Sequence, residues 1–194
     1  MGLSCTLSCS PDSFESDRPM RAVSLIFALL CPTLGTATEI DGKRVYLEAE
    51  DGTRIEIATL AGTAEAYEMT LNDAVFSDHF LSMRPFRCIE GTDKTWCHVP
   101  YPYEIRRDLR ADLIDLEYDF LFVWKGRTDY GIDMWNGVYY RLEPHGDGMV
   151  GRMHEMDMDK LAVPPDAGVL RPIRDVDLEQ ADPDSHWLPR MVVE

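Results

Sequence analysis

Along this chain, apolar and polar residues alternate in short runs, and turn residues separate the runs. Alternation with a period of two is typical of a β-strand with one buried face. The strongest run covers residues 114–124, where apolar residues alternate first with Asp115, Glu117 and Asp119 and then with further apolar residues. This pattern predicts a strand that is half-exposed at its start and buried on both faces at its end.

An acidic turn sequence at residues 50–52 lies between two shorter alternating runs and predicts a β-hairpin. A two-residue turn would set one of the leucines opposite a glutamate. A three-residue turn with its glycine in the left-handed conformation instead pairs Val45 with Ile57 and Leu47 with Ile55. We expect the second register, because it places all four apolar side chains on one face.

A second hairpin is predicted around Cys88 and Cys97, which have eight residues between them and turn residues at 91–94. Setting the two cysteines opposite each other also pairs Ile89 with Trp96. The sulfurs would then lie on one face of the hairpin, and these two apolar side chains on the other. We expect a disulfide that closes the hairpin and stabilises the fold by about 2.5–3 kcal/mol.

One helix is predicted at residues 102–112, because Ile105, Leu109 and Leu113 recur every four residues. Downstream, Asn136-Gly137 is typical of a two-residue type I′ turn and predicts a hairpin over residues 132–142. The glycine-rich loop at 144–148 then turns the chain into a last strand at 149–156.

Eight or nine strands joined by short turns, without a parallel crossover, predict a mainly β fold. We expect a single antiparallel meander over residues 38–162 that forms a small barrel, with a sandwich as the alternative. Residues 163–194 are acidic and rich in proline. They predict an extended, irregular tail, with Trp187 and Leu188 packing on the body.

The N-terminal region has the features of a secretory signal peptide at residues 20–37. A basic residue precedes a short apolar run, and small residues precede a cleavage site after Ala37. The run is shorter than the about 20 residues of a transmembrane helix, so we expect no transmembrane segment. Translation is expected to start at Met20, residues 1–37 to comprise an upstream extension and the signal peptide, and the mature protein to be periplasmic or secreted.

Acidic residues outnumber basic residues by 35 to 19, which gives a net charge of −16. Removing residues 1–37 takes away two arginines and three acids and leaves a net charge of −15. This charge disfavours nucleic acid as a partner and favours cationic partners. Only Cys88 and Cys97 of the five cysteines follow the cleavage site, as expected for a disulfide in an exported protein.

Aromatic residues are frequent on the predicted strands and could line an apolar cavity inside a barrel. The candidate pocket residues are Tyr118, Phe120, Trp124, Trp135, Tyr139 and Tyr140. The alternatives are plain core packing and an outward-facing patch that binds protein. The leading hypothesis is a non-enzymatic domain that binds a small ligand or another envelope protein.

Residues 145–159 combine two histidines, four methionines and several acids. Imidazole and thioether groups suit copper, whereas imidazole and carboxylate groups suit zinc. The candidate ligands are His145, Asp147, His154 and Met156. Because neighbouring strand residues point to opposite faces, the loop would have to fold back to gather them. Copper or zinc binding is therefore the alternative function, and no other cofactor is indicated.

A third hypothesis is an envelope hydrolase that uses Asp78, His79 or His98 for acid–base chemistry. The sequence contains no nucleophile elbow, no phosphate-binding glycine loop, no CxxC pair and no HExxH motif. It therefore predicts no catalytic residue.

Overall fold

The computed structural model describes residues 40–194, which lie in the second of two units of the chain, Thr36–Glu194. Its strands are β1 (Arg44–Glu48), β2 (Arg54–Thr63), β3 (Ala66–Leu71), β4 (Ser77–Leu81), β5 (Arg84–Glu90), β6 (Lys94–His98), β7 (Phe122–Gly126), β8 (Gly137–His145), β9 (Gly148–Met156), β10 (Glu179–Gln180) and β11 (Arg190–Val193). The α-helix is α1 (Ile114–Asp119), and the 3-10 helices are η1 (Asp73–Val75), η2 (Met158–Leu161), η3 (Asp175–Asp177) and η4 (Pro183–Ser185). The expected mainly β fold with one short α-helix is confirmed. The predicted extension and signal peptide, residues 1–37, lie outside the described residues.

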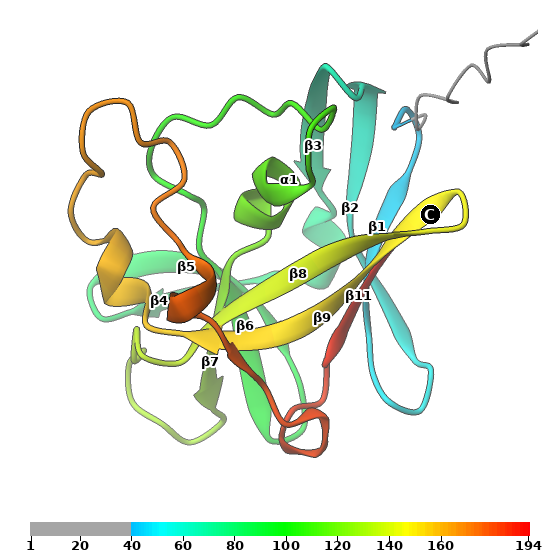
Figure 1. The fold of residues 1–194 in the computed structure, drawn as a ribbon. Helices are drawn as coiled ribbons and strands as arrows, with labels where there is room; N and C mark the ends of the chain where they lie inside the picture. The colour runs from blue at the N-terminus through cyan, green and yellow to red at the C-terminus, as the bar shows by residue number, and fades with distance from the viewer. Residues whose placement is uncertain (1–39) are drawn as a thin grey trace, which may run out of the picture. The chain divides into compact units, whose positions relative to one another are not determined.

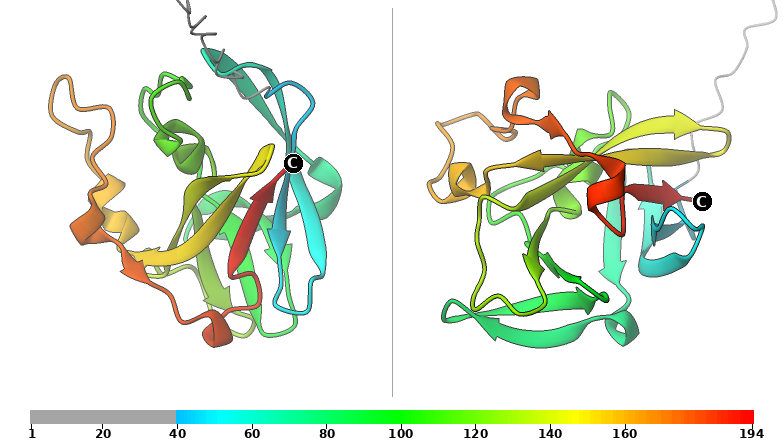
Figure 2. Two further views of the ribbon diagram at one scale, coloured as in Figure 1. Left: turned by 45° about the vertical axis from the view of Figure 1, so that its right-hand side comes forward. Right: turned by 90° about the horizontal axis from the view of Figure 1, so that it is seen from below.

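All eleven strands belong to one antiparallel sheet, in the order β3-β2-β1-β11-β9-β8-β7-β6-β5-β4, with β10 paired to β9 (Figure 1). Neighbours in the sheet are mostly neighbours in the chain, so the expected meander is confirmed. The sheet curves strongly, and β4 and β5 lie across from β8 and β9 (Figure 2). The edge strands β3 and β4 follow each other in the chain but do not pair among the described residues. The sheet is therefore open at this edge and is not closed into a barrel by hydrogen bonds.

The β1–β2 hairpin has the expected turn but a shifted register at its far end. The turn glycine has a φ of 81°, and Leu47 pairs with Ile55 as predicted. An irregularity in the ladder then pairs Val45 with Ala58 instead of the expected Ile57. An extra residue in one strand is the definition of a β-bulge, which periodicity alone does not reveal.

The cysteine hairpin is confirmed. Cys88 pairs with Cys97 and Ile89 with Trp96 across β5 and β6, and the two cysteine Cα atoms are 4.0 Å apart in the disulfide. The disulfide packs in one buried cluster, whereas Ile89 and Trp96 pack in another. The two faces of the hairpin therefore pack into two different parts of the core.

The region between β6 and β7 differs from the predicted helix and strand. Residues 102–112, expected to be helical, form an irregular loop, and Arg107 has a φ of 55°, which lies outside the helical region. The helix is α1, inside the run that was expected to be one long strand, and only β7 of that run is a strand. The strand prediction assumed that the alternating acids face water. In fact Asp115, Glu117 and Asp119 are all buried.

The predicted turn at Asn136-Gly137 is wrong. Gly137 instead begins β8, which pairs with β7 through Val123–Gly137 and Phe122–Val138. A Cβ at position 137 would collide with the carbonyl oxygen of Met156 on β9. The glycine is therefore required for close approach of two strands and not for a turn. The expected turn before β9 is present, where His145 pairs with Gly148.

The C-terminal segment is less irregular than expected. Strand β11 pairs with β1 on one side and with β9 on the other, so residue 162 does not end the β domain. The three apolar residues of β11 are too few to give a clear alternating pattern. The expected packing of Trp187 and Leu188 is confirmed, because Leu188 is fully buried and Trp187 contacts the core.

The core has a cluster on each face of the sheet. One cluster contains Trp96, Phe122 and Tyr140, and the other surrounds the disulfide with Tyr118 and Tyr139. Apolar residues from the loop after β6 and from the segment between β9 and β10 cover the second cluster. A groove opens at the border of this cover, next to the disulfide hairpin.

Candidate functional site

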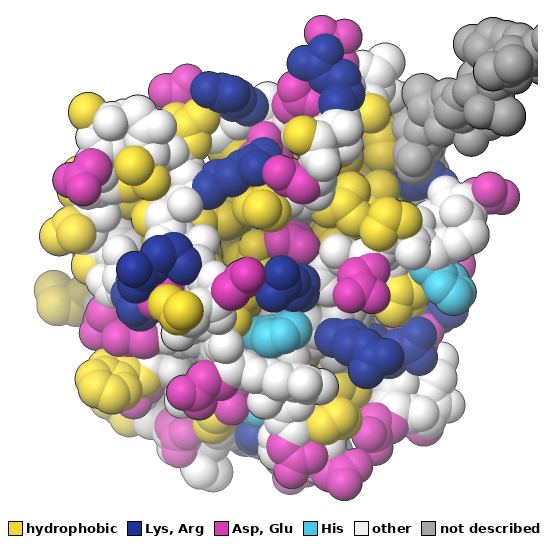
Figure 3. Space-filling view, viewed as in Figure 1, with side chains coloured by type: hydrophobic (Ala, Val, Ile, Leu, Met, Phe, Trp, Pro, Cys, Tyr) yellow, Lys and Arg dark blue, Asp and Glu magenta, His cyan; other side chains and the backbone are white. Residues whose placement is uncertain are grey.

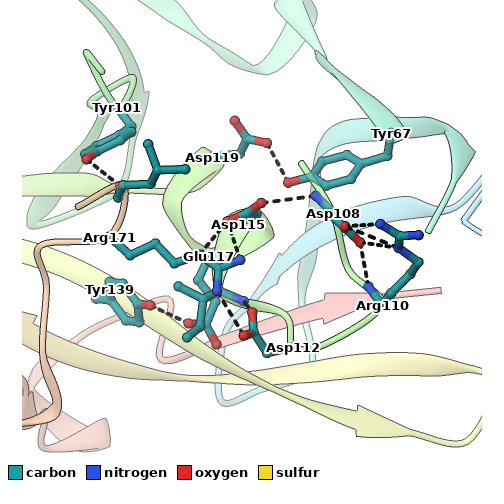
Figure 4. A network of polar contacts seen from close by, with 12 residues as sticks. Tyr67, Tyr101, Asp108, Arg110, Asp112, Asp115, Glu117, Asp119, Tyr139 and Arg171 are labelled. Carbon is teal, nitrogen blue, oxygen red and sulfur yellow. Dashed lines mark hydrogen bonds and ion pairs between the residues drawn. The ribbon is translucent and has the colours of Figure 1, made fainter. Parts of the chain in front are cut away.

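Helix α1 carries three buried carboxylates, Asp115, Glu117 and Asp119 (Figure 4). Buried carboxylates are rare unless they are paired, and in clefts they often mark reactive sites. Their partners therefore decide whether this cluster is a candidate for chemistry.

Glu117 accepts hydrogen bonds from the Tyr139 hydroxyl and, at 2.6 Å, from the backbone N–H of Leu142. Burial raises the pKa of Glu117, and these two hydrogen bonds oppose the rise. Burial, followed by the nearby Glu117, also raises the pKa of Tyr139. Tyr139 therefore keeps the proton that it donates.

The other two carboxylates form ion pairs with arginines. Asp115 lies 2.6 Å from Arg171 Nη2, and Asp119 lies 2.9 Å from Arg107 Nη2. The Tyr67 hydroxyl also donates to Asp119 at 2.8 Å. All three carboxylates are thus satisfied, so the cluster ties α1 to the sheet and to the C-terminal segment. None of these three carboxylates lines the groove described next.

The groove beside the disulfide hairpin has a volume of 650 Å³, within the range of small-molecule sites. Its walls are mainly apolar and come from the start of β5, the end of β6, the loop before β8 and the η2 region. They include Pro85, Phe86, Val99, Pro100, Pro102, Ile132, Met134, Met158, Leu161 and Ala162. The combination of this size with apolar walls makes the groove the best candidate for a ligand site.

Two arginines, a histidine and one acid, Asp159, add polarity to the groove. Arg87 is engaged with Asp73 at 2.8 Å and Asp78 at 3.3 Å, whereas Arg84 is exposed and forms no ion pair within residues 40–194. His98 is buried, which lowers its pKa, and its Nε2 lies 2.9 Å from the backbone oxygen of Asp119. Arg84 is thus the cation of the groove that is available to an anionic ligand.

The rim of the groove carries exposed apolar side chains. Ser82 and Ile132 line the groove, and the Ile132 N–H donates to Ser82 Oγ at 3.2 Å. Their neighbours Met83 and Tyr130 are strongly exposed. Ser82 and Met83 have φ values of 47° and 65°, which are unusual for residues other than glycine. The strained turn therefore holds an apolar residue in solvent next to an apolar groove.

The aromatic residues proposed from the sequence do not gather around this groove. Tyr118, Phe120, Tyr139 and Tyr140 are buried in the core, Trp124 is half-buried and Trp135 is exposed, and none of the six lines the groove. The sequence therefore missed the groove walls. The available signal was the set of prolines beside the disulfide hairpin, because the ladder between β5 and β6 ends at Arg87 and His98, before it reaches Pro85 and Pro100.

The metal candidates also lie apart. His145 and Asp147 are exposed at the β8–β9 turn, and His154 is six residues along β9 from Gly148, a distance of about 20 Å. Met156 is buried in the core. Within residues 40–194 no group of three or more His, Cys, Asp or Glu side chains could hold a metal ion.

The three residues considered for hydrolysis are engaged separately. Asp78 pairs with Arg87, and His79 Nε2 lies 3.0 Å from Glu90. His98 lies two strands from Asp78, about 10 Å away, with Arg87 between them. The structure therefore does not bring Asp78 and His98 together.

The surface seen in Figure 3 mixes basic and acidic side chains and has no continuous patch of one sign. Among the described residues, no helix has the length and apolar character needed to span a membrane. Comparison with known proteins gave no matching family model, no matching curated protein and no matching solved structure.

Proposed function

We propose that this protein is a non-enzymatic, exported binding protein whose ligand is a small molecule with an apolar body and an anionic end. The observation that carries the proposal is the groove of 650 Å³ beside the disulfide hairpin, with its apolar walls and exposed apolar rim. Burial of the ligand body against these walls supplies affinity, at about 25 cal/mol per Å² of apolar surface before the costs of binding. An ion pair with Arg84 selects the anionic end.

The amphipathic anion 1-anilinonaphthalene-8-sulfonate is a suitable probe, and its fluorescence on titration reports binding. We expect saturable binding of one probe per chain. Ala162 is an exposed groove residue, so Ala162→Trp should fill the groove and abolish binding with little loss of stability. Ala167→Trp, at an exposed position outside the groove, is the matched control and should bind normally. Equal binding by the two variants would remove the proposal.

The role of Arg84 has its own test. Arg84→Gln should weaken binding of the sulfonate about 2–5-fold, the size of an exposed ion pair. Binding of the neutral probe N-phenyl-1-naphthylamine should not change. Arg152→Gln is the control, because Arg152 is exposed, lies outside the groove and forms no ion pair within the described part of the chain. An equal loss for both probes would show that Arg84 acts through the shape of the groove and not through charge.

Export is the second part of the proposal, and it is supported by the signal-peptide pattern at residues 20–37 and by the disulfide. Expression of the chain from Met20 in a bacterium that secretes proteins should give a periplasmic or secreted product. Its intact mass should correspond to a chain that begins at Thr38 with Cys88 and Cys97 oxidised. An unprocessed product with free thiols in the cytoplasm would contradict export.

A further inference from the structure

At the other end of β6 from the groove, three side chains form a chain of hydrogen bonds. Lys94 Nζ lies 3.2 Å from His186 Nδ1, and His186 Nε2 lies 3.1 Å from Glu155 Oε1. The residues come from β6, β9 and the segment before β11. Their separation in the sequence explains why no local pattern predicts the cluster.

Glu155 determines which ring nitrogen of His186 carries the proton. A carboxylate can only accept, so the neutral ring donates from Nε2 and presents a bare Nδ1 to Lys94. The ring is held firmly, because the His186 side chain is 2% exposed and makes edge contacts with the rings of Trp96 and Trp124. An oriented base next to an amine is the arrangement that activates a nucleophile.

Lys94 differs from Lys43, Lys125 and Lys160, the other lysines of the described residues, in the imidazole nitrogen that lies beside its Nζ. It is half-buried, and burial lowers its pKa, opposed by the charge of Glu155. Its Nζ donates to the Ser185 backbone oxygen at 2.7 Å and lies 4.0 Å from the centre of the Trp124 ring. Among the described residues, Lys43 and Lys125 donate only to backbone oxygens, and Lys160 pairs with an aspartate.

A hollow of 380 Å³ opens beside Lys94 and His186. Trp187 forms part of its wall and packs against Gly91, where a Cβ would lie 2.6 Å from the indole ring. The remaining lining includes four acids, Glu50, Asp51, Asp93 and Asp184. Their negative charge repels anionic carbonyl compounds. The volume of the hollow is large enough for a small neutral one.

We propose that Lys94 is a covalent capture site for small neutral aldehydes, with His186 as the base and Glu155 as a positioning residue. His186 Nδ1 takes a proton from the Lys94 ammonium group, and the free amine attacks the aldehyde carbon to form a C–N bond. The carbinolamine hydroxyl then receives the proton from His186 and leaves as water, which gives a protonated imine. One C=O bond is exchanged for one C=N bond, and no oxidant or reductant takes part.

The test uses propanal as the probe and sodium cyanoborohydride to reduce the imine to a stable propyl-lysine. Peptide mass spectrometry of the full chain at pH 7 gives a rate for each lysine. We expect Lys94 to react at least about ten times faster than Lys43 and Lys160. This factor is smaller than the rate increase of about 10²-fold that a positioned general base can supply. With glyoxylate, an anionic aldehyde, Lys94 should react no faster than Lys43 and Lys160.

Two carboxylate variants distinguish positioning from a general loss of charge. Glu155→Gln should slow the reaction of Lys94 several-fold and leave Lys43 unchanged. Glu179→Gln is the matched control, because Glu179 pairs with Glu155 across β10 and β9 and is exposed. Equal rates at Lys94 and Lys43, or equal effects of the two variants, would overturn the proposal. Ala162→Trp should not alter the Lys94 rate, so failure of the groove and failure of this site are separate results.

Discussion

Replacing Arg171 by alanine is expected to lower the free energy of unfolding by about 3–5 kcal/mol, the cost of removing one partner from a buried ion pair. Asp115 has a side chain that is 2% exposed, and Arg171 contacts it at 2.6 Å while also reaching Asp112 at 2.9 Å. Without Arg171, the backbone N–H of Asp108 is the one donor to this buried carboxylate that remains within residues 40–194. Urea unfolding followed by fluorescence measures the effect.

An ion pair with an exposed arginine provides the control for this prediction. Arg174 pairs with Asp177, but the Arg174 side chain is 70% exposed. Asp177 also keeps Lys160 at 2.7 Å when Arg174 is removed, so Arg174→Ala should cost no more than about 1 kcal/mol. Adding Asp115→Asn to the Arg171→Ala variant should recover part of the lost stability, because it removes the unpaired charge. Equal, small losses for Arg171→Ala and Arg174→Ala would show that the buried carboxylates do not hold α1 in place.

Removing the disulfide by the double substitution of Cys88 and Cys97 with alanine is expected to cost about 3 kcal/mol, most of it from the loop-closure entropy of the unfolded chain. The two cysteines are fully buried between Tyr118, Leu121 and Val123, so lost packing adds to this cost. Urea unfolding with and without dithiothreitol measures it. Dithiothreitol should destabilise the natural chain by a similar amount and leave the double variant unchanged. No effect of dithiothreitol on the natural chain would contradict a bridge that stabilises the fold.

The β-hairpins could be predicted where local pattern and local pairing agree. The disulfide hairpin is such a case, because Cys88 opposite Cys97 also places Ile89 opposite Trp96. The turn before β2 is another, since its glycine must adopt a positive φ. In both, the paired residues belong to one hairpin and are close in the sequence.

Helix α1 could not be predicted, because its burial depends on distant partners. The acids of α1 alternate with apolar residues and suggest a solvent-facing strand edge. Arg171 lies 56 residues from Asp115, and Tyr67 lies 52 residues from Asp119. The groove was missed for the same reason, since its walls come from four separate segments and no single segment marks it. Most of the aromatic candidates instead pack in the core, where large side chains bury the most apolar surface.

The most direct test of the groove as the ligand site is an NMR titration of the isotope-labelled protein with 1-anilinonaphthalene-8-sulfonate. We expect backbone amide signals to shift mainly at groove residues, including Phe86, His98, Val99 and Leu161. Another hollow has a volume of 540 Å³ and is lined by Ala49, Val150 and Arg190 among others. It serves as the internal reference, and the amide signals of its residues should not shift. Shifts centred on that second hollow, or spread evenly over the sheet, would show that the groove is not the ligand site.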